Sequence, residues 1–182
     1  MKNLMLLCTF SLLLGCEVGK QHSSESVTQE MSNTSEINNP QEMAVMQWTQ
    51  LEYLQHPCHG FCPVYQIVLQ RDGNYVYNGE RHTSQFGEIK SKLSNERTKA
   101  AFSAFEQLQR LGLPEVINRD NCALYATDHS IIEFKLRGDS KQWRFKHDLG
   151  CHAFTDRDRV LELTQIIQAS LPIREHVNPA EK

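Results

Sequence analysis

The residue types best suited to chemistry lie in one short stretch, HPCHGFCPVY at residues 56–65, which holds two cysteines and two histidines. Thiolate and imidazole groups at short spacing are typical ligands of zinc or copper. A cysteine pair can also cycle between thiol and disulfide. A third interpretation is structural, because Gly60 permits the chain reversal that would join Cys58 to Cys62. The metal ligands in the first interpretation would be His56, Cys58, His59 and Cys62.

The sequence after this stretch favours the structural interpretation. Pro63 is followed by alternating apolar and polar residues, which are typical of a strand. Disulfide oxidoreductases usually place two residues between their cysteines at the start of a helix, whereas here three residues separate the cysteines before a strand. We therefore expect a disulfide, with redox and metal chemistry as the alternatives.

The N-terminus carries an export signal followed by a lipidation motif. Lys2 precedes an apolar run over residues 4–14, which is too short to cross a hydrocarbon core of about 30 Å as a helix. The sequence LLGC at residues 13–16 resembles the lipobox of bacterial lipoproteins. The resemblance implies a signal peptide over residues 1–15, cleavage, and attachment of a diacylglyceryl group and a further acyl chain such as palmitate to Cys16. We expect a membrane-anchored lipoprotein of the cell envelope that faces the periplasm.

Residues 16–47 continue from the lipidated cysteine into a polar segment rich in Ser, Thr, Asn, Gln and Glu. Such a composition buries too little apolar surface to fold, so we expect a disordered tether with a typical reach of about 30 Å. The formal net charge of the whole chain is −3. Because nucleic-acid binding needs clustered excess basic charge, we expect no nucleic-acid partner.

Four cysteines remain after the leader and the lipidated residue, and four cysteines permit three pairings. An exported chain matures in an oxidising compartment, where the thiols of a small domain usually end as disulfides. The preferred pairs are Cys58 with Cys62, which are close in sequence, and Cys122 with Cys151. The second bond would close a loop of about 30 residues and stabilise the fold by roughly 3 to 4 kcal/mol.

Hydrophobic periodicity locates the main elements of a single domain over residues 48–172. Period-two alternation predicts a strand near residues 48–54, a hairpin over 64–80, a third strand within 81–93 and a second hairpin over 129–147. Apolar residues at spacings of three and four predict two helices, one that begins at Ser94 or Asn95 and one that opens with a capping box from Thr155.

This order predicts an α+β domain, with an antiparallel sheet of about five or six strands and two helices packed on one face. Residues 173–182 are expected to form a loose tail. His82, His129 and His176 are each expected at the surface.

Two blocks of residues in the sequence resemble a known family. The motif C-x-G-x-C-P-x-Y, at residues 58–65, and a weaker block with Tyr125, Thr127 and Asp128 resemble the bacterial family called domain of unknown function 6438. The similarity covers about residues 48–170. It implies a small, often exported domain whose motif cysteines lie close together, and it implies no activity. Cys122 and Cys151 are additions to that pattern, which further favours pairing them with each other.

No nucleophile elbow, phosphate-binding glycine loop or zinc-protease helix is present in the sequence, so we assign no catalytic residue and no cofactor. The expected function is a non-catalytic binding or structural module, stapled by disulfides, with a protein of the envelope as its partner. The alternative is an extracytoplasmic protein that handles electrons or metal through Cys58, Cys62 and nearby histidines.

Overall fold

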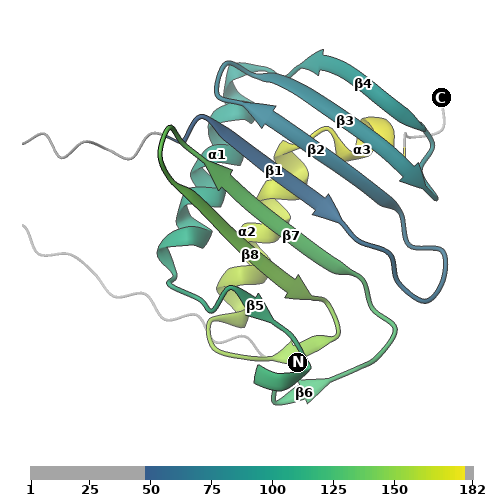
Figure 1. The fold of residues 1–182 in the computed structure, drawn as a ribbon, viewed down its shortest axis with the longest axis vertical. Helices are drawn as coiled ribbons and strands as arrows, with labels where there is room; N and C mark the ends of the chain where they lie inside the picture. The colour runs from purple at the N-terminus through teal and green to yellow at the C-terminus, as the bar shows by residue number, and fades with distance from the viewer. Residues whose placement is uncertain (1–47, 179–182) are drawn as a thin grey trace, which may run out of the picture. The chain divides into compact units, whose positions relative to one another are not determined.

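A seven-stranded sheet organises the fold in the computed structural model, which describes residues 48–178 (Figure 1). The strand order is β4-β3-β2-β1-β7-β8-β5, so β1 lies at the centre of the sheet. Neighbouring strands are antiparallel except β5 and β8, which pair in parallel. The strands of this sheet are β1 (Gln50–Gln55), β2 (Val64–Gln70), β3 (Asn74–Arg81), β4 (Gly87–Lys92), β5 (Val116–Ile117), β7 (Ile131–Arg137) and β8 (Gln142–Asp148).

Two short strands form a separate sheet, and the helices cover one face of the large one. β6 (Leu124–Tyr125) pairs antiparallel with β9 (Cys151–Ala153). Figure 1 shows α1 and α2 on the same face of the large sheet. The helical segments are α1 (Asn95–Arg110), the 3-10 turn η1 (Arg119–Asn121), α2 (Arg157–Ser170) and α3 (Ile173–His176).

The core lies between the helices and the sheet. Side chains of a strand alternate between its two faces, and in β1 the fully buried Leu51 and Tyr53 belong to the core. Aromatic rings dominate the centre: Phe134 in β7 lies edge-on to Tyr53, with 5.6 Å between centroids, and edge-on to Phe105 in α1, also at 5.6 Å. Burial of these rings holds α1 to the sheet.

The local signals in the sequence explain where the hairpin and the first helix begin. Gly73 adopts a φ of 90°, which favours glycine, and Asp72 Oδ1 accepts a hydrogen bond from Asn74 N at 2.9 Å, so the chain reverses between β2 and β3. Ser94 caps α1, because its hydroxyl accepts a hydrogen bond from Arg97 N. The sequence predicted both features.

The expected start of the second helix is wrong in detail. The N-cap of α2 is Asp156, which has a φ of 60° and makes no side-chain capping hydrogen bond. The helix therefore begins one residue later than a cap at Thr155 requires, and the predicted capping box does not form.

At the C-terminal end of α2, Arg97 of α1 donates hydrogen bonds to the carbonyls of Ser170, at 3.0 Å, and Leu171, at 2.8 Å. This guanidinium satisfies carbonyls that a helix end leaves without intrahelical partners.

The prediction of a loose tail is wrong for residues 173–178. Residues 173–176 form α3, and both His176 and Val177 are buried. Ser84 N and Gln85 N donate hydrogen bonds to the carbonyls of Val177 and His176, which fixes this segment to the loop between β3 and β4. The expectation of a surface position for His176 is wrong for the same reason.

The α+β class and the predominantly antiparallel sheet agree with the sequence, whereas the strand count does not. The longer strands and the two main helices follow the predicted order. The sheet has seven strands instead of five or six, because the two-residue β5 adds to its edge, and β6 and β9 form a second small sheet. Strands of two or three residues are too short to show a period in the sequence.

The expected signal peptide over residues 1–15, the lipidated Cys16 and the tether to residue 47 lie outside the described residues. Within residues 48–178, no helix combines the length and the apolar character that crossing a membrane requires.

Candidate functional site

The cysteine-rich stretch forms the loop between β1 and β2, and its two cysteines are bonded to each other. Cys58 and Cys62 form a disulfide with an S–S distance of 1.96 Å and a Cα–Cα distance of 5.7 Å. Gly60 at the tip has a φ of 147°, a conformation that side chains disfavour. Phe61 beside it is 89% exposed. The disulfide therefore closes the loop, and the loop leaves one aromatic ring in solvent.

The four residues considered as metal ligands do not form one site while Cys58 and Cys62 are joined in a disulfide. Both sulfur atoms are taken up by the disulfide, His59 is exposed, and His56 Nε2 lies 2.9 Å from Glu133 Oε2. Within residues 48–178, no group of three or more His, Cys, Asp or Glu side chains is arranged to hold a metal ion.

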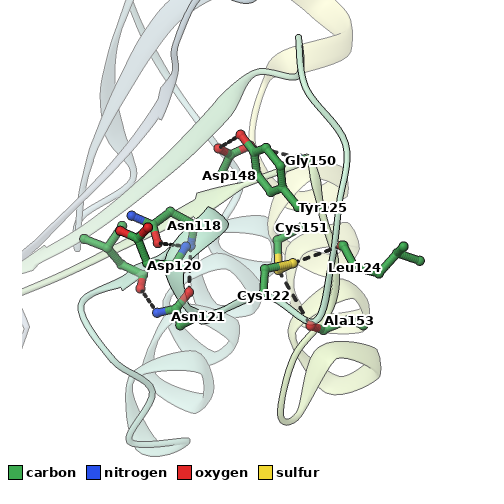
Figure 2. Close-up of a disulfide and its surroundings, with 11 residues drawn as sticks. Asn118, Asp120, Asn121, Cys122, Leu124, Tyr125, Asp148, Gly150, Cys151 and Ala153 are labelled. Atoms are coloured by element: carbon green, nitrogen blue, oxygen red, sulfur yellow. Dashed lines mark hydrogen bonds between the residues drawn. A yellow bond between two sulfur atoms is a disulfide. The ribbon is translucent and has the colours of Figure 1, made fainter.

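The second disulfide joins Cys122 to Cys151, with an S–S distance of 2.11 Å, so both disulfides are the pairs that the sequence favoured. Figure 2 shows this bond beside a small polar cluster. Asp148 accepts a hydrogen bond from the hydroxyl of Tyr125 at 2.8 Å and another from the backbone N of Gly150 at 2.9 Å. The disulfide and Asp148 together fasten the segment that precedes β7 to the segment that precedes α2.

One cavity collects residues from both blocks that carried the family resemblance. It has a volume of about 720 Å³ and lies where the loop of the first disulfide, the residues before β7, α2 and the C-terminal segment meet. Cys62, Pro63 and Tyr65 line it from the first block, and Asp128 lines it from the second. This size falls within the range of about 300 to 1,000 Å³ that is typical of small-ligand sites.

A chain of hydrogen bonds orders the polar wall of the cavity. The Gln168 amide of α2 donates to the Tyr53 hydroxyl at 2.8 Å, and that hydroxyl donates to Gln55 Oε1 at 3.3 Å. The Gln55 amide in turn donates to the Ser130 hydroxyl, which donates to the carbonyl of His56. Since every member is held by its neighbour, these side chains are oriented before any ligand arrives.

The tyrosines in and beside this wall are hydrogen-bonding groups, not bases. Burial raises the pKa of Tyr53 to about 12, and burial together with the neighbouring Tyr53 raises the pKa of Tyr65 well above its ordinary value. Their rings stack with centroids 5.9 Å apart. Both hydroxyls are therefore neutral and protonated at physiological pH.

Sequence reasoning missed most of the wall. It singled out Cys62, but not Gln55, Ser130 or Gln168. Gln165 and Gln168 lie three residues apart on α2, which puts them on one side of the helix. This spacing was the only local sign in the sequence that could have indicated them. Gln55 and Ser130 carry no such sign, because they come from strands and loops that meet only in the folded chain.

On the face of the sheet opposite to α1 and α2, the buried carboxylate of Glu133 has a structural role. Arg144 Nε lies 2.8 Å from Glu133 Oε1, and Lys146 Nζ lies 3.6 Å from Oε2. Burial alone would raise the pKa of this carboxyl, but the hydrogen bond from His56 and the charges of Lys135, Lys146 and Arg144 outweigh it and hold the pKa below 4.5. Its charge is already balanced by these neighbours, so this face offers no free carboxylate at that position.

Two histidines are buried and kept neutral. His147 in β8 is 1% exposed, and its ring lies edge-on to Phe154 at 5.1 Å between centroids. His176 is 7% exposed and shares a hydrogen bond of 2.9 Å between its Nε2 and the Tyr75 hydroxyl. Burial lowers the pKa of each imidazole below its ordinary value of 6.5.

We expect acidification below about pH 6.5 to destabilise the domain. Because each folded-state pKa lies below the unfolded value of 6.5, the unfolded chain binds more protons near that pH, so stability is complete above it and falls as the pH drops towards the folded pKa. Replacing His147 by Phe should flatten this pH dependence, measured as the free energy of urea unfolding from about pH 7.5 to about pH 5.

The matched control for this prediction is His59→Phe, since His59 is exposed. The control should keep the slope of the native protein. An unchanged slope in His147→Phe would contradict the assignment of the pH dependence to this buried ring.

Comparison with known proteins identifies a family. A family model described as "Domain of unknown function (DUF6438)" matches residues 49–167. No curated protein matches the chain.

Proposed function

The chain belongs to the DUF6438 family of domains of unknown function. From the LLGC sequence at residues 13–16, the two disulfides and the cavity, we propose that it is a lipid-anchored protein of the bacterial cell envelope. Its disulfide-stapled domain faces the periplasm and binds a ligand or an envelope partner without chemical conversion. The observation that carries this proposal is the cavity of about 720 Å³ beside the Cys58–Cys62 loop.

The arrangement of the cavity wall supports binding. Its hydroxyl and amide groups are fixed by mutual hydrogen bonds, and the Ser130 hydroxyl donates to a backbone carbonyl instead of to a base. A nucleophilic serine needs an adjacent general base to accept its proton. The wall is thus suited to recognising the donors and acceptors of a bound molecule.

The two disulfides support an extracytoplasmic location. Stable disulfides form in oxidising compartments and are rare in the cytosol. The LLGC sequence at residues 13–16 supports attachment to a membrane through Cys16, and the polar residues to position 47 would let the domain stand clear of the lipid surface.

Replacing Cys16 by Ser should release the protein from membranes, because the thiol that carries the lipid is then missing. The measurement is the distribution of the protein between soluble and membrane fractions after cell breakage. The control is Cys8→Ser, the same substitution within the apolar run that is removed with the leader. Membrane retention of the Cys16→Ser protein would contradict the anchor.

The rival function is redox or metal handling at Cys58 and Cys62. It is favoured by one observation: both cysteines are only partly buried, and Cys62 lines the cavity, so a partner could reach the disulfide. Once reduced, the pair would offer two thiols near His56 and His59. Stoichiometric zinc or copper in protein purified without added metal, or reversible reduction of this disulfide in cells, would favour the rival.

A further inference from the structure

We propose that the cavity beside the Cys58–Cys62 loop binds a short peptide with a free ammonium group at one end and a free carboxylate at the other. The inference rests on the proposed binding function and specifies its ligand. Three features of the cavity lead to it. Neutral side chains joined by hydrogen bonds form one wall, one charged side chain of each sign lines the cavity, and apolar side chains add to a lining that encloses a limited volume.

The neutral wall matches peptide groups. Gln55 and Gln168 each use one amide proton within the chain of hydrogen bonds and keep a second, and Gln168 also keeps its side-chain carbonyl. A peptide backbone presents the complementary carbonyl acceptors and N–H donors. Because these side chains are already oriented, binding costs little further side-chain entropy.

The two charges match peptide ends. Asp128 and Arg174 both line the cavity and both are exposed. Neither forms an ion pair with any residue between 48 and 178. Asp128 has a φ of 70°, a left-handed conformation that aspartate and asparagine adopt more readily than most other side chains. An ammonium group would pair with Asp128, and a carboxylate would pair with the guanidinium of Arg174 in charge-assisted hydrogen bonds.

The rest of the lining limits what the peptide can be. Pro63, Leu149 and Ile173 add apolar surface to the lining, and the volume of about 720 Å³ accommodates a ligand of ordinary small-molecule size. Small side chains would fit against such a surface. A neutral sugar could use the amides but would leave both charged groups without partners, which is why the zwitterionic ligand is favoured.

The test is isothermal titration of the mature protein, held in detergent micelles, with trialanine. We expect a dissociation constant below about 1 mM. N-acetyl-trialanine, which lacks the ammonium group, and trialanine amide, which lacks the carboxylate, should each bind about tenfold more weakly or worse.

Variants assign each end of the peptide to its residue. Arg174→Gln should weaken trialanine about tenfold and leave trialanine amide unchanged, because the carboxylate that Arg174 holds is then already absent. Asp128→Asn should likewise weaken trialanine about tenfold and leave N-acetyl-trialanine unchanged, because the ammonium group that Asp128 holds is then already absent. Asparagine tolerates the positive φ at this position. The matched controls are Arg110→Gln and Asp139→Asn, which remove the same charges from exposed positions outside the cavity lining. Both controls should bind trialanine as the native protein does.

Four outcomes would overturn the inference. One is the absence of trialanine binding at about 10 mM, a second is equal binding of the free and blocked peptides, and the third is unchanged binding in both cavity variants. Binding of chitobiose in place of the peptides would overturn it in favour of a neutral glycan. The proposed function is tested separately by the membrane fractionation of Cys16→Ser, so a protein that stays anchored and disulfide-bonded but ignores trialanine refutes the ligand and not the anchored module.

Discussion

Replacing Cys122 and Cys151 together by alanine is expected to lower the free energy of unfolding by about 3 to 4 kcal/mol. The bond joins residues 29 positions apart, so its loss frees a long loop in the unfolded chain. The Cys58–Cys62 bond joins residues only 4 positions apart, and its removal by the same double substitution should cost about 2 kcal/mol. The measurement is urea unfolding of both double variants beside the native protein.

The order of the two effects is the diagnostic result for the disulfides. Loop-closure entropy grows with the length of the closed loop, so the bond between Cys122 and Cys151 must stabilise more. Equal losses, or a larger loss on removing Cys58 and Cys62, would show that the short loop does more for stability than closing a turn.

Replacing Phe134 by alanine is expected to lower the free energy of unfolding by about 3 to 5 kcal/mol. Phe134 is fully buried at the point where the rings of Tyr53, Phe105 and Phe145 meet, all within 5.8 Å of it between centroids. Truncation would leave a cavity that rigid aromatic neighbours cannot fill. The measurement is again urea unfolding, under the same buffer conditions.

The control for this prediction is Phe86→Ala, because Phe86 is 67% exposed. We expect a change within about 0.5 kcal/mol for this variant. A small loss for Phe134→Ala, similar to that of the control, would contradict the packing of β7 between β1, β8 and α1.

The fold could be predicted from the sequence wherever its signals are local. The β2–β3 hairpin is indicated by the alternation of apolar and polar residues on both sides of Asp72 and Gly73. Helix α1 is indicated by apolar residues at spacings of three and four after Ser94. The edge strand β5 and the small sheet of β6 and β9 are too short to show any period. The four-residue α3 is held by contacts with the loop after β3, which a single stretch of sequence cannot reveal.

The candidate site could be predicted only in part, for the same physical reason. The cysteine spacing and Gly60 pointed to the Cys58–Cys62 loop. The polar wall, however, depends on the hydrogen bond between Gln55 and Ser130, 75 positions apart, and on the one between Gln168 and Tyr53, 115 positions apart. Such pairs meet only through the tertiary fold, and no motif marks them.

The most direct test of the proposed function is the intact mass of the mature protein extracted from membranes, with free thiols alkylated before and after reduction under conditions that preserve bound metal. We expect the mass of a chain that begins at Cys16 with its lipid, no alkylated thiol before reduction, and alkylation of Cys58, Cys62, Cys122 and Cys151 after it. Free thiols at Cys58 and Cys62 before reduction, or a mass increment that matches a metal ion, would contradict a disulfide-stapled binding module and favour redox or metal chemistry at HPCHGFCPVY.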